Sequence, residues 1–190
     1  MILYDPVDRE SIGNLMTQRE SAWQDIPTIL KSIIKDFSLK TDKALEFGVE
    51  YGYSTSALAN IFTHVTGVDT FTGDPHSGVK QDHYEMTKNY LKDWKNIELI
   101  KSSYQEFTQD RKEHFDLIHI DIIHDFENTY KCGEWSIQNS DVTIFHDTES
   151  YAEVKRSCEE LAQNYNLYFY NYPKSYGLGI LSKKPIQSPI

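Results

Sequence analysis

Cysteine, basic clusters and long apolar runs are all scarce in this sequence. Its 190 residues include only two cysteines, Cys132 and Cys158, which stand far apart without the spacing of metal ligands. We therefore expect free, buried thiols and a reducing, cytoplasmic setting. No apolar run approaches the roughly 18 residues that cross a bilayer. The first residues, MILYDPVDRES, lack the charged-then-apolar order of a leader peptide.

Positive charge is also in short supply. The chain has 19 Lys and Arg against 29 Asp and Glu, which gives a net charge of −10 without any Lys/Arg cluster. Nucleic-acid backbones and anionic membranes repel an acidic surface of this kind. We therefore expect neither nucleic acid nor a membrane as the main partner.

Short apolar runs alternate with helical patterns along most of the chain. Strands are predicted at residues 43–47, 65–68, 97–100, 115–120 and 142–145, with a helical pattern after each of them except the third. The runs are continuous, as in strands that are buried on both faces. This alternation predicts an α/β, doubly wound sheet. At the end of the chain, LYFYNY and LGILS flank PKSYG, which predicts an antiparallel hairpin.

A helical segment precedes the first predicted strand. Apolar residues from Trp23 to Phe37 recur at helical spacing, with Pro27 in the first turn. We interpret residues 1–40 as an N-terminal helical segment packed on the domain and residues 41–190 as that domain. Core packing is the expected role of this segment, and covering a ligand or forming a homodimer contact are the alternatives.

The first junction between strand and helix, ALEFGVEYGYSTSALA, carries two glycines. Gly48 and Gly52 permit a positive φ and the close approach of a ligand. The helix that follows, with Ser54 as its expected N-cap, offers free N–H groups. Glu50 lies between the glycines and would repel a pyrophosphate, so the loop favours a ligand without phosphates. A tight turn without a ligand is the alternative.

Asp69 ends the second predicted strand, 21 residues after Gly48. An acidic residue about 20 positions beyond a glycine loop accepts hydrogen bonds from ribose hydroxyls in this architecture. A turn cap is the alternative for Asp69 alone, but the spacing from the glycine loop favours ribose. After the third strand, Ser102 and Ser103 are candidates for an adenine edge, or for loop hydrogen bonds alone.

Histidine and aspartate gather after the fourth and fifth predicted strands. Their side chains are His119, Asp121, His124 and Asp125 in IHIDIIHDFEN, and His146 and Asp147 in TIFHDTES. Neighbouring parallel strands bring these ends together, where a cluster can bind a divalent cation or supply a general base. Solvated loop residues and helix caps are the alternative. His119, which alternates with Asp121, is expected to be a hydrogen-bonded core residue.

Three stretches carry a resemblance to a known family. ALEFGVEYGYST is similar to the pattern E-x-G-x-x-x-G-x-S-T, FDLIHIDIIHDFENTY to D-L-I-H-I-D-G-x-H-x-Y-E, and VTIFHDT to I-I-F-H-D-T. Together they resemble the class I S-adenosylmethionine-dependent methyltransferases over residues 43–160. The narrower resemblance is to small-molecule O-methyltransferases near macrocin O-methyltransferase and the cephalosporin-hydroxylase-like proteins.

The resemblance implies a Rossmann-like sheet of seven strands whose last strand is antiparallel. It also implies S-adenosylmethionine contacts at Glu46, Gly48, Ser54 and Thr55 around methionine, Asp69 on ribose, and Ser102 or Ser103 near adenine. In metal-using relatives two carboxylates hold Mg²⁺, which carries over to Asp121 and Asp147 with His146 or His124 nearby. The segments DTFTGDPHSG and NYPKSYG are where lids and acceptor pockets are expected.

The resulting hypothesis is methyl transfer from S-adenosylmethionine to an oxygen of a small acceptor, such as a sugar or a natural product. Asp121, together with His146 or His124, is expected to carry catalysis, either with a cation or as part of a general base. Two positions depart from the pattern: Ile122 replaces a glycine, and IQNSD replaces Pro-Gly-Gly before the fifth strand. A non-catalytic cofactor-binding protein and a metal-dependent hydrolase are the alternatives.

Overall fold

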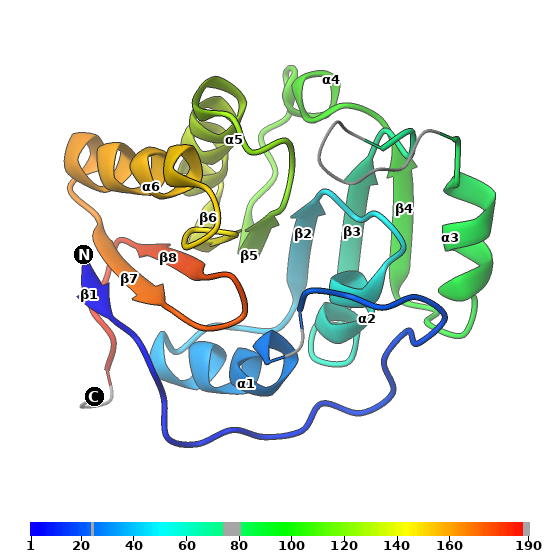
Figure 1. Cartoon of the computed structure of the whole chain (residues 1–190), viewed down its shortest axis with the longest axis horizontal. Coiled ribbons are helices and arrows are strands. Elements are labelled where there is room, and N and C mark those ends of the chain that lie inside the picture. The colour runs from blue at the N-terminus through cyan, green and yellow to red at the C-terminus, as the bar shows by residue number, and fades with distance from the viewer. Residues whose placement is uncertain (24, 74–80, 188–190) are drawn as a thin grey trace.

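The computed structural model describes residues 1–23, 25–73 and 81–187, which form one mixed sheet with helices on both faces (Figure 1). The strands are β1 Ile2–Leu3, β2 Lys43–Phe47, β3 His64–Asp69, β4 Ile97–Lys101, β5 Phe115–Ile120, β6 Ser140–His146, β7 Tyr168–Tyr172 and β8 Leu178–Ser182. The helices are α1 Ile26–Asp36, α2 Tyr53–Ala59, α3 Tyr84–Tyr90, α4 Tyr104–Thr108, α5 Phe126–Gln138 and α6 Ala152–Tyr165.

The sheet has the strand order β1-β7-β8-β6-β5-β2-β3-β4. β8 runs antiparallel to both of its neighbours, and the other pairings are parallel. This confirms the doubly wound sheet and its antiparallel last strand. The eighth strand is β1, which adds two residues at the edge beside β7 and is too short to show a pattern in the sequence.

The order of the strands creates a switch point between β2 and β5. From β2 the chain steps outward to β3 and β4, and it then returns to the other side of β2 with β5. In open α/β sheets, ligands bind beyond the carboxyl ends of the strands at such a point. The loops that follow β2, β3, β5 and β6 therefore surround the expected ligand site.

Two apolar clusters, one on each face, hold the sheet between its helices. On one face, Ile29 and Ile33 of α1 pack with Ala44 of β2. On the other face, Leu45 of β2 packs with α5 and α6, whose free thiols Cys132 and Cys158 are fully buried. Because both faces are covered, Ala44, Leu45 and Phe47 of β2 are all buried, with only Glu46 among them, which explains the apolar run in the sequence.

Three local expectations were wrong. Gly52, with φ 91°, precedes α2, so Ser54 lies inside the helix and does not cap it. Trp23 lies before α1, which begins at Ile26. The helix α4 was not expected, although Ser103 and Glu106 form a capping box at its start. No described helix is long and apolar enough to cross a membrane.

Candidate active site

A cavity of about 650 Å³ opens at the carboxyl ends of the central strands, within the size range of small-molecule sites. The loops after β2, β3, β4, β5 and β6 supply most of its lining. One wall comes from the N-terminal segment, which contributes Met16, Glu20, Ser21, Ala22 and Trp23. That segment is fixed to α2, because the Met16 amide donates a hydrogen bond of 2.9 Å to the Ser56 hydroxyl.

The glycine loop is shaped by contact with the end of β5. Gly48 has φ 88°, and a Cβ added there would lie 1.7 Å from the carbonyl oxygen of Asp121. Gly52 also has a positive φ, and a Cβ there would lie 2.6 Å from the Leu91 side chain. Only glycine combines this backbone conformation with so close an approach. The loop thereby joins the two parts of the cavity, one at β2 and one at β5.

Asp69 lines the cavity and also fixes the glycine loop. One of its carboxylate oxygens accepts hydrogen bonds of 2.8 Å from the amides of Val49 and Glu50, and the other accepts one of 2.6 Å from Phe71. A carboxylate oxygen has two lone pairs, so acceptor capacity remains. Asp69 can therefore fix the turn and still accept a hydrogen bond from a ribose hydroxyl, so the two predicted roles are compatible.

Glu46 and Thr55 do not line the cavity, unlike Gly48 and Ser54. Both are fully buried, and the Thr55 hydroxyl donates a hydrogen bond to the Glu46 carboxylate. The other Glu46 oxygen lies 2.8 Å from Nδ1 of His119, which is fully buried as expected. Direct methionine contacts at Glu46 and Thr55 therefore do not fit this arrangement; the pair instead fastens α2 to β2 and β5.

Ser102 and Ser103 lie on the cavity wall after β4. The Ser103 hydroxyl accepts a hydrogen bond of 3.2 Å from the Glu106 amide as part of the capping box. The Ser102 hydroxyl donates one of 3.1 Å to the Ser103 carbonyl. Tyr104 and Asn128 complete this part of the wall, joined by a hydrogen bond of 3.0 Å from the tyrosine hydroxyl.

The aspartate and histidine residues after β5 and β6 do come together. Nε2 of His124 lies 2.9 Å from Asp147 and 3.5 Å from Asp121. Nδ1 of His146 lies 3.2 Å from Asp121, and its Nε2 lies 3.1 Å from the Ser175 carbonyl. Asp125 does not join them, because its carboxylate caps α5 by accepting from the Asn128 amide at 2.8 Å.

Charge compensation dominates the electrostatics of this Asp–His cluster, which we define as Asp121, His124, His146 and Asp147. Burial alone would raise the pKa of Asp121, but His146 and His124 hold it well below its usual range. Burial opposes the charge on His124, yet the hydrogen bonds that it donates to Asp121 and Asp147 raise its pKa to about 9. Burial likewise opposes the charge on His146, and Asp121 raises that pKa.

The donor atoms of the Asp–His cluster fit a divalent cation. One ligand atom each from Asp121, His124 and Asp147 lies within 4.8 Å of the others. Two carboxylates with one imidazole suit a hard or borderline divalent ion, and the raised pKa of His124 indicates that the cluster favours positive charge. Asp147 has φ 66°, a conformation that Asp and Asn tolerate better than most residues.

Aromatic wall residues are the part of the site that the sequence did not reveal. Trp23 lies between His119 and His146, at ring-centroid distances of 4.4 Å and 5.3 Å. Tyr151 stacks on His124 at 4.1 Å. Trp23 belongs to the N-terminal segment for which covering a ligand was an alternative to core packing, whereas Tyr151 lies in no motif and no pattern identified it. Of the two expected acceptor segments, DTFTGDPHSG is described as far as Gly73, and its residues Thr70, Thr72 and Gly73 line the cavity; the rest of it lies outside the described residues. NYPKSYG reaches the Asp–His cluster through Ser175.

The fold, the glycine loop and the acidic residue after β3 define the class: a class I S-adenosylmethionine-dependent methyltransferase. A family model described as a methyltransferase domain matches residues 45–148. The chain belongs to that methyltransferase domain family. The resemblance inferred from its three motifs is thereby confirmed. No curated protein sequence matches the chain at a significant level.

Solved structures of methyltransferases share this fold at low sequence identity. The O-methyltransferase of Bacillus cereus, in complex with S-adenosylhomocysteine, is 17% identical, with a TM-score of 0.63 over 88% of this chain and 84% of its own. The S-adenosylhomocysteine-bound methyltransferase PaMTH1 of Podospora anserina is 12% identical, with a TM-score of 0.65 over 87% and 80%. The N-methyltransferase NodS of Bradyrhizobium japonicum is 15% identical, with a TM-score of 0.59 over 89% and 97%.

Proposed function

We propose that the protein transfers a methyl group from S-adenosylmethionine to an oxygen of a small acceptor. The observation that carries this proposal is the continuity of one cavity, in which the glycine loop and Asp69 meet the Asp–His cluster. A methyltransferase must hold donor and nucleophile in line, and adjoining sites for the two achieve that. Neighbours that bind S-adenosylhomocysteine support the choice of donor.

The residues of the glycine loop would bind and orient the donor. Asp69 would accept from the ribose hydroxyls, Ser54 and the backbone at Gly48 would hold the methionine end, and Ser102 or Ser103 would face adenine. Each of these residues lines the cavity. Glu46 and Thr55 would act indirectly, because they are buried against one another and position the start of α2.

The Asp–His cluster would bind the acceptor hydroxyl. Without a cation, His124 holds a proton at neutral pH, because its pKa is about 9, so it would donate to the acceptor oxygen. A Mg²⁺ or similar ion on Asp121 and Asp147 would supply the positive charge instead and would lower the pKa of the acceptor hydroxyl. The neutral imidazole of His124 or His146 would then accept the proton.

Calorimetry tests the donor half of this proposal. We expect S-adenosylhomocysteine to bind the wild-type protein and the Asp93→Asn variant with similar heats. We expect a smaller heat with the Asp69→Asn variant. Asp93 is exposed at the end of α3, away from the cavity. Failure of wild-type protein to bind the nucleoside would rule out the methyltransferase proposal.

A non-catalytic cofactor-binding protein is the second candidate. It is favoured by Ile122, which stands where the family pattern has glycine and which lines the cavity. This candidate predicts nucleoside binding without methyl transfer to any member of a broad panel of hydroxylated acceptors, with or without Mg²⁺. Transfer of a labelled methyl group to one acceptor excludes it.

A further inference from the structure

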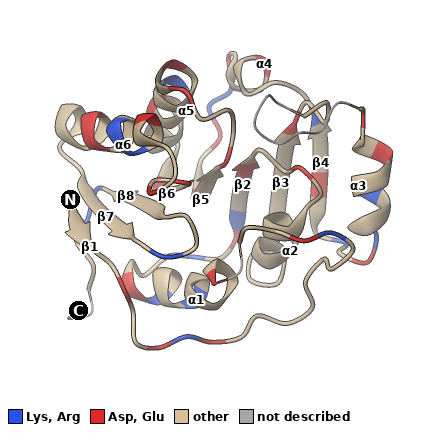
Figure 2. Cartoon of the chain, viewed as in Figure 1, with Lys and Arg blue, Asp and Glu red and all other residues tan. Residues whose placement is uncertain are grey.

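The lining of the cavity carries an excess of negative charge. Five acidic residues line it, namely Glu20, Glu50, Asp69, Asp121 and Asp147, whereas no described lysine or arginine does. Three histidines line it as well, and S-adenosylmethionine would bring one net positive charge. The described lining thus holds five carboxylates against three imidazoles. The acidic residues around the loops after β2 and β6 are visible in Figure 2.

The carboxylates that line the cavity differ in their hydrogen bonds and ion pairs within the protein. Asp69 accepts backbone hydrogen bonds from the glycine loop, and Asp121 and Asp147 lie against histidines. Glu20 is exposed at the mouth of the cavity and takes part in no ion pair among the described residues. Its carboxylate is thus accessible to a ligand that reaches the N-terminal wall of the cavity.

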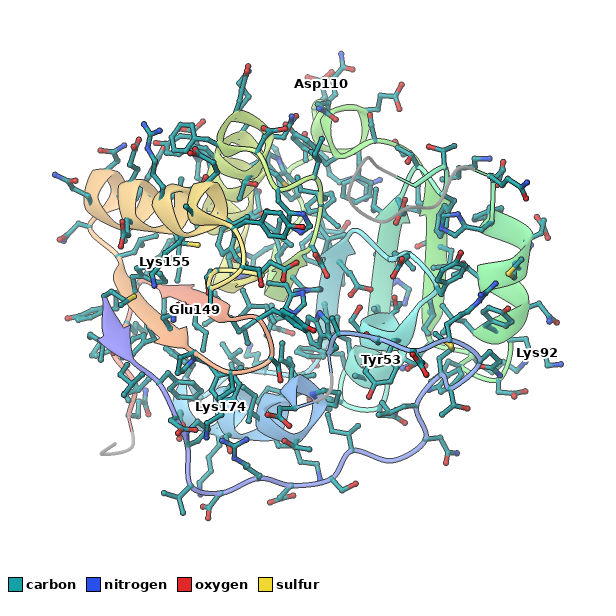
Figure 3. The ribbon with its side chains drawn as sticks, viewed as in Figure 1. Tyr53, Lys92, Asp110, Glu149, Lys155 and Lys174 are labelled. Carbon is teal, nitrogen blue, oxygen red and sulfur yellow. The ribbon has the colours of Figure 1, made fainter. Side chains whose placement is uncertain are left out.

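Aromatic rings surround this acidic lining. Trp23, Tyr51, Tyr53, Tyr104 and Tyr151 all contribute to the wall, and Figure 3 labels Tyr53 beside α2. Aromatic faces attract cations, and Tyr51 already does so, because the Arg19 guanidinium lies 4.8 Å from its ring centre. The indole of Trp23 is 2% exposed, and its Nε1 has no hydrogen-bond partner among the described residues. A hydroxylated ligand could supply the missing acceptor atom.

We propose that the methyl acceptor carries an ammonium group in addition to its hydroxyl, and that Glu20 recognises this group. This inference rests on the proposed function, since it assigns the acceptor class for the same cavity. Carboxylates and aromatic rings together are the usual environment for an organic cation. Acceptors that carry phosphates or a carboxylate are disfavoured, because the lining would repel them.

Three catechols that differ only in charge test the proposal. Dopamine, 4-ethylcatechol and 3,4-dihydroxyphenylpropionate end the same side chain with an ammonium, a methyl and a carboxylate group. Each is titrated calorimetrically into protein saturated with S-adenosylhomocysteine. We expect dopamine to bind about tenfold more tightly than the carboxylate, corresponding to about 1.4 kcal/mol. The preference should decrease as salt is raised, because Glu20 is exposed.

Variants identify the residue that is responsible. Glu20→Gln should remove most of the preference for dopamine over 4-ethylcatechol while leaving the affinity for 4-ethylcatechol within about twofold. Glu85→Gln, on the exposed side of α3 and outside the cavity, should leave the preference unchanged. An unchanged preference in Glu20→Gln would overturn the role assigned to Glu20.

The remaining outcomes separate this inference from the proposed function. If S-adenosylhomocysteine binds but dopamine binds no better than the carboxylate, the inference is wrong and the proposed function stands. The same conclusion holds if the nucleoside binds and none of the three catechols does. If the nucleoside itself does not bind, the proposed function fails, and the inference fails with it.

Discussion

The two halves of the cavity are built in different ways. Next to β2 and β3, backbone groups set the geometry: Gly48 touches the Asp121 carbonyl, and Asp69 accepts three backbone amides. At the ends of β5 and β6, side-chain charges set the geometry, with each carboxylate held by an imidazole. The first half is fixed by steric fit. The second is held by a balance of charge that a proton or a cation can shift.

The largest expected effect is on the steric half. Gly48→Ala places a methyl group 1.7 Å from the Asp121 carbonyl oxygen and requires a positive φ of alanine. Because neither backbone can yield without moving its strand, we expect a loss of stability of about 3 kcal/mol or more. We also expect loss of S-adenosylhomocysteine binding. Urea unfolding and calorimetry measure the two effects.

A matched glycine provides the control. The Cβ of Gly13→Ala would lie 3.7 Å from its nearest contact, the Asn60 side chain, which is ordinary van der Waals distance. We expect its stability to stay within about 0.5 kcal/mol of wild type. If both variants behave alike, the close approach at Gly48 does not define the site.

Asp69→Asn should have the next largest effect. An amide group would present N–H donors to backbone N–H groups of Val49 and Glu50, or to that of Phe71. Losing a partly buried hydrogen bond to a charged carboxylate in this way costs about 1–3 kcal/mol. We expect a destabilised glycine loop and at least about tenfold weaker nucleoside binding. Equal nucleoside affinity in Asp69→Asn and wild type would show that Asp69 acts on the loop alone.

The same contrast explains what the sequence could predict. The strands other than β1 and the positive φ of the two loop glycines were predicted correctly, because burial on both faces and a glycine requirement leave marks in consecutive residues. The sequence left the role of Trp23 open between core packing and covering a ligand, and it gave no sign of Tyr151; the two residues reach the site from the N-terminal segment and from the loop before α6. The burial of Glu46 was also missed, because its partner His119 lies 73 positions away and is adjacent only through strand pairing.

A smaller effect is expected in the charged half. Asp147→Asn keeps a side chain that tolerates the φ of 66° but removes one negative charge from the Asp–His cluster. We expect the affinity for Mn²⁺, used as a spectroscopic probe, to fall about tenfold or more, with nucleoside affinity within about threefold of wild type. Electron paramagnetic resonance measures the former. A parallel loss of both affinities would mean that the halves are not independent.

The smallest expected effect is a pH dependence of stability in protein kept free of divalent cations by a chelator. The pKa of His124 is about 9, above its ordinary value of 6.5, so protonated His124 stabilises the folded state fully below pH 6.5. That contribution is lost as the pH rises through about 9. Because His124 and His146 share the charge, we expect this contribution to the free energy of unfolding to be modest, about 1 kcal/mol.

Urea unfolding at pH 6.5 and 9.5 measures the effect. The stability of wild type should decline between the two pH values, and that of His124→Gln should decline less. The control variant His114→Gln, at an exposed position, should decline like wild type. A wild type whose stability is flat over this range would show that the carboxylates do not hold a proton on His124, and the second half of the cavity would then lack the charge balance that distinguishes it from the first.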